Sequence, residues 1–288
     1  MAVDLHIHTA ASSDGEFTPR EIVELARANQ LEAIALTDHD TVNGLEEGLY
    51  WGEQSGLEVI PGCEIASSHH GKWVHILGYF IDYRHPAIER LCSNLQNEWQ
   101  QNIDAQIAKL RESGFYLEKE KVLEDSPRPM FNSYGTVMFA DPRNDQNQLL
   151  NKYRHQENGV IRFCMDWVVP GKPYNAPQGT PEAAEVVNVI REIGGIPILA
   201  HPAATLTEED DPLIDDLLGF GIAGLEVYCS YHQLKQEEHY LAYCRKKGVL
   251  VTCGSDFHGK FKPHVKMGGV KNNSYQVVEQ LKSYLRDH

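Results

Sequence analysis

Histidine and acidic residues recur along this chain at positions where predicted strands end. His6 and His8 alternate in the first apolar segment, so both side chains point to the same face of a strand. Asp14 lies in the turn after that strand, and His75 begins a later one. The other candidates lie at the ends of later strands: His39, Glu64, His201, Asp256 and His258. Mixed imidazole and carboxylate ligands suit Zn²⁺, Mn²⁺ or Fe²⁺, whereas Ca²⁺ prefers oxygen ligands alone. The pattern predicts a site for divalent metal ions of the first group.

Each of these candidates, taken alone, has a simpler interpretation. A histidine at a strand end is more often structural than a ligand, and Asp14 fits a Ser-Ser-Asp-Gly turn. Other histidines lack such a placement and are assigned to solvent or packing: His69, His70, His85, His155, His239 and His288. The combined H-x-H and D-x-H spacing is more specific, because chance rarely puts polar residues at strand ends and apolar residues within the strands.

Short β-rich segments alternate with helical patterns in the first and last thirds of the chain. The predicted strands are Val3–Thr9, Leu31–Thr37, Leu57–Ile60, His75–Ile81, Ile196–Ala200, Gly224–Tyr228 and Val249–Cys253. Helices are predicted from Thr18, from Thr180 to Gly194, and over Asp210–Gly219, Gln233–Lys247 and Ser274–Leu285. The first helix opens with a capping-box pattern of Thr18, Pro19 and Glu21.

This alternation predicts an α/β fold with a parallel sheet, and the number of strand–helix units favours a barrel over an open sheet. The carboxyl ends of barrel strands meet at one mouth, so the candidate ligands are expected to converge there. Residues 86–179 interrupt the pattern. They combine a long helical pattern over Pro86–Ser113 with a stretch rich in Asn, Gln, Pro and Gly. We interpret 86–179 as an inserted, mainly helical cap on a catalytic barrel formed by 1–85 and 180–288.

The composition restricts the class of protein and of partner. The chain has 288 residues, of which 42% are hydrophobic and 23% charged, as in soluble globular proteins with a substantial core. Runs of roughly 18 apolar residues are absent, so no membrane span is expected. With 26 basic against 41 acidic residues the net charge is −15, which argues against binding long nucleic acid through a basic surface.

The six cysteines are far apart, lie mostly in apolar runs and form no C-x-x-C pair. The first residues have neither the basic nor the apolar region of a secretory signal. Reduced, buried thiols in a cytoplasmic protein are therefore expected rather than disulfides or a cysteine-bound zinc site.

The arrangement of ligands resembles the PHP family, named for its polymerase and histidinol phosphatase members. The segments that carry the resemblance are Asp4–Thr9, Thr37–Asp40, Gly62–Glu64, His75, Ala200–Pro202 and Gly254–His258. The resemblance covers the chain outside the insertion. It implies a distorted (β/α)₇ barrel with two or three divalent ions, Mn²⁺, Zn²⁺ or Fe²⁺, at its mouth.

The resemblance also implies which residues hold each ion. His6, His8, Glu64 and Asp256 are expected to hold the first ion, and Glu64 bridges to a second that is also held by His75 and His201. Asp14, His39 and His258 are expected to hold a third. Some members of the family have histidine where this chain has Asp14.

Amidohydrolases also open with H-x-H and are the nearest alternative on the same barrel. They place a carboxylated lysine at the bridging position, where this chain has Glu64, and no lysine follows another metal-bearing strand. A non-catalytic PHP module is a further alternative. Such modules have degenerate ligand sets, whereas every ligand position is filled here.

The expected chemistry is hydrolysis of phosphate esters. Metal ions close together lower the pKa of a bridging water, so we expect a bridging hydroxide to attack phosphorus while a third ion binds a phosphate oxygen. An imidazole then protonates the leaving group. The predicted catalytic residues are His232, Asp256 and His201.

Substrate contacts are expected from cations near the ligands. Lys260, Lys262 and His264 follow the last ligand on a loop, and His232 follows a strand end. Lys260 and His264 are the predicted phosphate contacts on that loop, together with His232. Related enzymes have an Arg-Pro-His segment in the cap, to which Arg128 corresponds, with Met130 in place of the histidine. Arg143 and Arg162 are alternative cations.

The resemblance is greatest to a subgroup that acts on nucleoside 3′,5′-bisphosphates, on the 5′ end of short oligonucleotides or on a cyclic ribose phosphate. A small phosphorylated nucleotide or ribose is therefore the expected substrate. Histidinol phosphate is an alternative that the insertion and the Glu-Val-Tyr…His segment (226–232) disfavour.

Overall fold

The computed structural model describes residues 2–12, 14–126, 129, 131–169, 172–176 and 179–288. The chain divides into two compact units. The first unit comprises Met1–Leu95 and Thr180–His288, and the second comprises Gln96–Gly179. All of the predicted metal ligands belong to the first unit.

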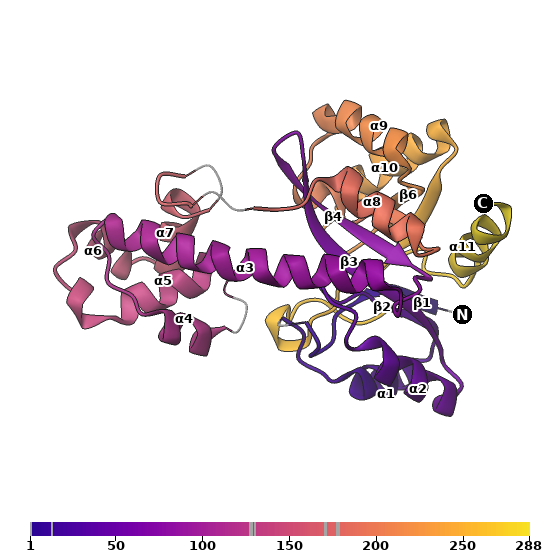
Figure 1. Cartoon of the computed structure of the whole chain (residues 1–288), viewed down its shortest axis with the longest axis horizontal. Coiled ribbons are helices and arrows are strands. Elements are labelled where there is room, and N and C mark those ends of the chain that lie inside the picture. The colour runs from indigo at the N-terminus through magenta and orange to yellow at the C-terminus, as the bar shows by residue number, and fades with distance from the viewer. Residues whose placement is uncertain (1, 13, 127–128, 130, 170–171, 177–178) are drawn as a thin grey trace. The chain divides into compact units, whose positions relative to one another are not determined.

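The first unit is built on a seven-stranded sheet in which the strands are neighbours in chain order (Figure 1). Its strands are β1 (Ala2–Ile7), β2 (Leu31–Leu36), β3 (Glu58–His69), β4 (Lys72–Tyr79), β5 (Ile196–Leu199), β6 (Gly224–Tyr228) and β7 (Leu250–Cys253). Each predicted strand is present, so the alternating pattern in the sequence correctly predicted a mixed α/β fold.

The sheet is not parallel throughout, and the prediction of a parallel sheet was wrong at β4. This strand runs antiparallel to both β3 and β5, whereas the remaining neighbours are parallel. The physical reason is the connection between β3 and β4, a two-residue turn at His70 and Gly71 with positive φ values of 48° and 75°. A two-residue turn can join only antiparallel strands, because a parallel pair needs a long crossover.

The chain after β7 returns to the first strand. Phe257 forms an isolated parallel bridge with Ile7, and its carbonyl accepts a hydrogen bond from the backbone N–H of His8 at 3.0 Å. The backbone N–H of Asp256 donates to the carbonyl of His6 at 2.9 Å. These bonds place ligands from the two ends of the sequence beside one another.

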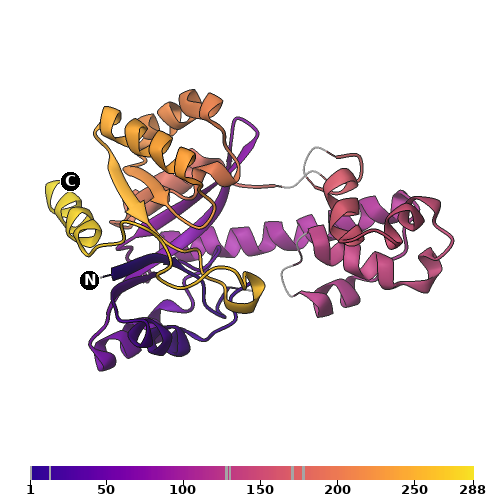
Figure 2. The ribbon, with the colours of Figure 1, turned by 180° about the vertical axis from the view of Figure 1, so that it is seen from behind.

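Helices of the first unit lie beside the strands. They are α1 (Pro19–Ala28), α2 (Leu45–Ser55), α8 (Ala183–Glu192), α9 (Asp211–Phe220), α10 (Leu234–Lys247) and α11 (Gln276–Asp287), with short 3₁₀ helices at Pro202–Ala204, Glu208–Asp210 and Gly259–Phe261. In Figure 1 and from behind in Figure 2, α1 and α2 lie together near β1 and β2, and α8, α9 and α10 lie together near the later strands.

Two helices show how local sequence sets these elements. The predicted capping box of α1 is present, with Thr18 and Glu21 each bonded to the other's backbone N–H. Helix α2 was not predicted, and it contains two glycines, which are poor helix formers. A Cβ on Gly48 would lie 2.1 Å from Leu36, and one on Gly52 would lie 2.5 Å from Val59. The glycines therefore let α2 pack closely against β2 and β3.

The core of the first unit is apolar on both sides of the sheet. Side chains such as Ile34 and Ile76 belong to one buried cluster, and Leu5 and Ile198 belong to another. All six cysteines are free and buried, as predicted. Within the described residues, no helix has the length and apolar character needed to cross a membrane.

The second unit is helical in its described residues. Helix α3 (Pro86–Glu112) begins at residue 86, where the insertion was predicted to begin. The division between the two units, between Leu95 and Gln96, falls inside this helix. The others are α4 (Lys119–Asp125), α5 (Phe131–Ala140), α6 (Gln148–Arg154) and α7 (Gly159–Trp167), with a 3₁₀ helix at Pro142–Asn144. Their separate core is built around buried side chains such as Leu110, Met138 and Phe163.

Candidate metal centre

The predicted ligands converge at one place in the first unit, although they are spread over most of the sequence. His6 is the penultimate residue of β1, His8 follows the strand, and Glu64 and His75 lie within β3 and β4. The remaining ligands lie on the segments that follow other strands or on the loop after His8: Asp14, His39, His201, Asp256 and His258. Strand β3 continues past its predicted end at Ile60, so Glu64 is held inside a strand instead of beyond one.

Glu64 is the centre of the cluster and is fully buried. Its Oε2 atom lies 3.2 Å from Nε2 of His6 and 3.2 Å from Nε2 of His8. Its Oε1 atom lies 2.9 Å from Nδ1 of His75 and 2.9 Å from Nε2 of His201. Oε2 also lies 3.1 Å from Nδ1 of His39. The two carboxylate oxygens thus face two different groups of imidazoles, which is the arrangement a bridging ligand requires.

Asp256 completes the group around His6 and His8. Its Oδ1 atom lies 3.5 Å from Nε2 of His6 and 3.1 Å from Nε2 of His8. The ligand atoms of His6, His8, Glu64 and Asp256 all lie within 4.8 Å of one another, and all four residues are buried.

Several buried atoms of this group lack a hydrogen bond to any described residue. They are Nε2 of His6, Nε2 and Nδ1 of His8, Oε2 of Glu64 and Oδ1 of Asp256. Burying polar atoms without partners is costly unless something else binds them. A divalent cation among these four residues would satisfy the imidazole Nε2 and carboxylate atoms at once, so the residues present fit a metal ion.

A second group lies on the more exposed side of the cluster. Asp14 Oδ2 lies 3.5 Å from Nε2 of His39 and 3.3 Å from Nε2 of His258. With His8, these residues form another set whose ligand atoms lie within 4.8 Å of one another. The side chain of Asp14 is 36% exposed, whereas that of His258 is 2% exposed. This group is therefore the more accessible to a ligand from solvent.

Burial and mutual charge set the protonation states. Burial raises the pKa of Glu64, but the imidazoles of His39 and His6 outweigh this and hold the pKa well below its ordinary value. The pKa of Asp256 is lowered in the same way, against burial, chiefly by His6 and His8. Burial would lower the pKa of His8, yet Asp256 and Glu64 raise it to about 9. The carboxylates are thus ionised, and protons compete with metal ions for His8.

Glu226 on β6 supports the cluster and was not predicted from the sequence. Its Oε1 atom lies 3.0 Å from Nδ1 of His6, and its Oε2 accepts a hydrogen bond from the backbone N–H of His201 at 3.0 Å. A carboxylate on the far nitrogen of a metal-binding imidazole fixes its orientation and tautomer. An acidic residue between Leu225 and Val227 in an apolar strand was the signal that could have found it.

Two further buried carboxylates hold the backbone near the ligands and were also not predicted. Asp4 accepts hydrogen bonds from the backbone N–H and hydroxyl of Ser255 at 2.8 and 2.6 Å, which joins β1 to the segment after β7. Asp38 accepts from the backbone N–H and hydroxyl of Thr9 at 2.6 and 2.8 Å. Each lies within two residues of a ligand, so its bonds fix the position of that ligand.

His232 lies beside the cluster, buried and bonded at both ring nitrogens. Its Nδ1 lies 2.7 Å from the carbonyl of Val227, which can only accept, so this nitrogen carries the proton. Its Nε2 accepts a hydrogen bond from the backbone N–H of Ala203 at 3.1 Å. The imidazole therefore connects β6 to the segment that follows His201.

Lys262 lies against one of the candidate ligands. Its Nζ donates to Oδ2 of Asp256 at 2.5 Å and lies 5.0 Å from the centre of the Tyr231 ring. The Tyr231 ring in turn lies 5.1 Å from the ring of His201. Asp256 thus presents Oδ1 to the imidazoles and Oδ2 to Lys262.

The other predicted substrate contacts lie elsewhere or outside the described residues. Lys260 and His264 are exposed, and the Lys260 ammonium lies 5.4 Å from the centre of the Phe261 ring. Arg128 lies outside the described residues, as does Met130. Arg143 and Arg162 belong to the second unit, where Arg143 pairs with Asp141 at 2.5 Å.

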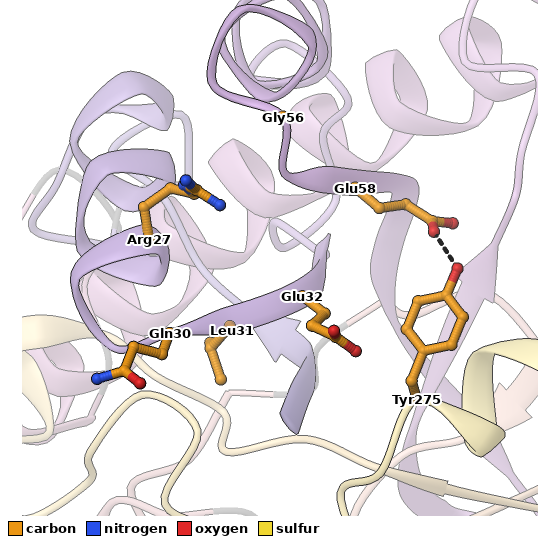
Figure 3. Close-up of a pocket in the computed structure, with 7 residues that line it drawn as sticks. All are labelled: Arg27, Gln30, Leu31, Glu32, Gly56, Glu58 and Tyr275. Atoms are coloured by element: carbon orange, nitrogen blue, oxygen red, sulfur yellow. Dashed lines mark hydrogen bonds between the residues drawn. The ribbon is translucent and has the colours of Figure 1, made fainter. Parts of the chain in front are cut away.

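A pocket at the other end of β2 and β3 is not part of this centre (Figure 3). It is lined by residues that begin these strands, such as Leu31 and Glu58, and by Tyr275, whose hydroxyl donates to Glu58 at 2.5 Å. None of the predicted ligands lines it.

Comparison with known proteins identifies relatives that are all named for the hydrolysis of phosphate esters. Phosphoribosyl 1,2-cyclic phosphate 1,2-diphosphodiesterase of Eggerthella lenta is 28% identical, over 92% of this chain and 98% of its own length. The 3′,5′-nucleoside bisphosphate phosphatase of Chromobacterium violaceum is 26% identical, over 89% of this chain and 87% of its own length. A 5′-3′ exoribonuclease of Haemophilus influenzae is 30% identical, over 88% of this chain and 89% of its own length.

A solved structure agrees with these relatives. A protein of Bifidobacterium adolescentis, described as a candidate metal-dependent phosphoesterase, superposes with a TM-score of 0.76 at 26% identity, over 98% of this chain and 95% of that one. The family model for the PHP domain matches residues 4–164, which is more than half of the chain. The protein therefore belongs to the PHP domain family of metal-dependent phosphoesterases.

Proposed function

We propose that this enzyme hydrolyses a phosphate ester on the ribose of a small nucleotide or sugar phosphate. The observation that carries the proposal is the buried cluster around Glu64. In it, Nε2 of His6 and of His8, Oε2 of Glu64 and Oδ1 of Asp256 face each other without hydrogen-bond partners among the described residues. The relatives named for a cyclic phosphodiesterase, a bisphosphate phosphatase and an exoribonuclease support the substrate class.

The proposal assigns the ligands to two or three divalent ions, Mn²⁺, Zn²⁺ or Fe²⁺. His6, His8, Glu64 and Asp256 form the first set, and Glu64 joins it to a second set with His75 and His201. The third set is Asp14, His39 and His258. When bound, such ions lower the pKa of water towards neutrality and offset the charge of phosphoryl oxygens.

The chain's own residues have separable roles in this proposal. Glu64 holds imidazoles on both of its oxygens, and Glu226 fixes the orientation of His6. Lys262 is the cation placed to bind a phosphoryl oxygen, because its ammonium contacts the ligand Asp256 and remains partly exposed, with 23% of its side chain accessible. Its pKa is raised above its ordinary value by Asp256, against the effect of burial, so it stays charged.

We assign His232 a positioning role in place of the expected general acid. Its Nε2 accepts from a backbone N–H and its Nδ1 proton is bonded to a carbonyl, so neither nitrogen has a proton to give to a leaving group.

The proposal also includes the finer architecture expected from the family. The hydrogen bonds between β1 and the segment after β7 support a sheet that curves into a distorted (β/α)₇ barrel. Residues 86–179 are proposed to act as the cap that selects the substrate.

A panel of substrates tests this proposal. Purified enzyme is assayed with a nucleoside 3′,5′-bisphosphate, 5-phosphoribosyl 1,2-cyclic phosphate, a short 5′-phosphorylated RNA, histidinol phosphate and an N-acyl amide. We expect turnover of one or more of the ribose phosphates and at least 10³-fold less in the Glu64→Gln variant. Hydrolysis of the amide without any phosphate ester would overturn the proposal, as would turnover of histidinol phosphate alone.

Lys262 allows a sharper test of phosphate binding. The Lys262→Met variant keeps the alkyl chain and removes the charge, so we expect KM to rise about 10-fold or more with a smaller change in kcat. Lys260→Met is the matched control on the same loop, and its KM is expected to stay within about twofold of the wild type. Equal effects of the two substitutions would contradict the role assigned to Lys262.

A further inference from the structure

A second group of potential metal ligands lies at the tip of the β3–β4 hairpin, apart from the cluster around Glu64. His69 is the last residue of β3, and His70 is the first residue of the two-residue turn that leads into β4. Asp216 faces them from α9. From the sequence alone, both histidines are assigned to solvent or packing, because no strand-end pattern includes them.

The turn brings consecutive side chains to the same place. In a regular strand His69 and His70 would point to opposite faces. His70 has a φ of 48°, in the left-handed region, and the two rings lie with centroids 4.2 Å apart. The hairpin thus presents two imidazoles together.

The distances to Asp216 suit ligands of one ion. Oδ2 of Asp216 lies 3.2 Å from Nε2 of His70 and 3.9 Å from Nε2 of His69. Two ligands about 2.1 Å from a tetrahedral zinc ion lie about 3.4 Å apart, between these two values. The three ligand atoms lie within 4.8 Å of one another.

His69 provides an independent indication of a ligand. Its side chain is only 6% exposed, and Nε2 forms no hydrogen bond with any residue that the structure describes. The ring packs edge-on against Phe220 of α9, with centroids 5.5 Å apart. A buried imidazole nitrogen that faces a carboxylate at 3.9 Å, too far for a hydrogen bond, has lost water without gaining a partner.

We propose that His69, His70 and Asp216 bind a divalent ion of the Zn²⁺ class, separate from the catalytic ions. Two imidazoles and a carboxylate form a ligand set typical of Zn²⁺, and water would complete the coordination at this partly exposed position. Asp216 and His70 are 56% and 67% exposed, so an ion can reach the site from solvent.

The ion would fasten the hairpin to α9. Strands β3 and β4 carry Glu64 and His75, each five residues from the nearer turn histidine, so the site would hold the strands that supply the catalytic centre. Its expected effect is on stability, because no residue of the site contacts the ligands around Glu64.

Zinc content measured by equilibrium dialysis tests the proposal. Wild-type holoenzyme and the His70→Asn and Asp216→Asn variants are dialysed against buffered Zn²⁺, and bound zinc is measured by mass spectrometry. Asparagine tolerates the left-handed conformation of residue 70, so the hairpin should fold in that variant. We expect the wild type to hold one more equivalent of zinc than either variant, with an affinity at this site at least about 10-fold higher.

A matched control and two further measurements separate this site from the catalytic one. His155→Asn removes a histidine of the second unit and should keep the wild-type zinc content. Phosphoesterase turnover should be the same in all four proteins, and zinc should raise the melting temperature of the wild type and the control more than that of the two variants. Equal zinc content in all four proteins would overturn the proposal.

Discussion

At the scale of single residues, one carboxylate organises the whole centre. One oxygen of Glu64 faces His6, His8 and His39, and the other faces His75 and His201, at 2.9 to 3.2 Å. The position of Glu64 inside the paired strand β3 gives it the fixed backbone that such a role requires.

Glu226 offers a test of how the ligands are oriented. Replacing Glu226 by Gln keeps the shape but removes the charge beside Nδ1 of His6, and loss of such a partner typically costs 10- to 100-fold in metal affinity or activity. We expect that loss in metal content at limiting metal, measured by mass spectrometry, and in turnover. The control is Glu237→Gln, which alters a buried glutamate whose ion pair is with Lys271. Wild-type metal affinity in the Glu226 variant would contradict this account.

His232 allows a positioning role to be distinguished from general acid catalysis. In the His232→Phe variant the segment after His201 loses its bond to the imidazole and shifts, so we expect turnover to fall about 10- to 100-fold. The decrease should be the same for p-nitrophenyl phosphates and for alkyl phosphates. Loss of a general acid would instead be about 10²- to 10⁴-fold and confined to the poor alkoxide leaving group. Comparing the two substrates in steady-state kinetics decides between these roles.

The sequence predicted which ligands converge, but not what supports them. The ligands stand out because they are polar residues at the ends of apolar strands, as with His201 after Ile196–Leu199. Glu226 lies inside such a strand. The sequence does not show that folding brings its carboxylate beside His6 and His201. Lys262 and Lys260 are indistinguishable in the sequence, and only the path of the loop brings Lys262 to Asp256.

At the scale of elements, the strands were predictable and one of their directions was not. Alternating β-rich and helical segments identified all seven strands, because burial imposes its pattern on each segment separately. The antiparallel direction of β4 follows from the two-residue turn at His70 and Gly71. That turn was hidden in the sequence, because the third predicted strand ended at Ile60 and left the hairpin unassigned.

The close packing of β1 against the segment after β7 can be tested at Gly254. A Cβ at this position would lie 2.2 Å from Cβ of His6 and 2.7 Å from Oε1 of Glu226. Gly254→Ala should therefore lower the free energy of unfolding by about 1–3 kcal/mol or more, and it should reduce metal content by displacing His6. Chemical denaturation and metal analysis measure the two effects.

Gly219 in α9 is the matched control for this substitution. A Cβ there meets nothing within 4 Å, so Gly219→Ala should leave metal content unchanged and stabilise the helix by about 0.5–1 kcal/mol. A Gly254→Ala variant as stable and as rich in metal as Gly219→Ala would contradict the close approach of the two segments.

At the scale of the whole molecule, the net charge of −15 is compatible with a phosphorylated substrate. Asp14, Glu64 and Asp256 contribute to that charge as bare carboxylates, yet the two or three divalent ions that we propose would bring four to six positive charges to the same place. The metal-bound centre would then be a positive region of an acidic protein. A small phosphate ester fits this distribution of charge better than long RNA does.

The central claim is that phosphate ester hydrolysis depends on metal ions held by the cluster around Glu64. The measurement that tests it most directly is the rate of phosphate release from the preferred ribose phosphate before chelation, after dialysis against a chelator, and after Mn²⁺, Zn²⁺ or Fe²⁺ is restored. We predict that chelation removes at least 99% of the activity and that one of these ions restores it in the wild type but not in Glu64→Gln. Full activity after complete removal of metal, or equal restoration in the Glu64→Gln variant, would contradict the claim.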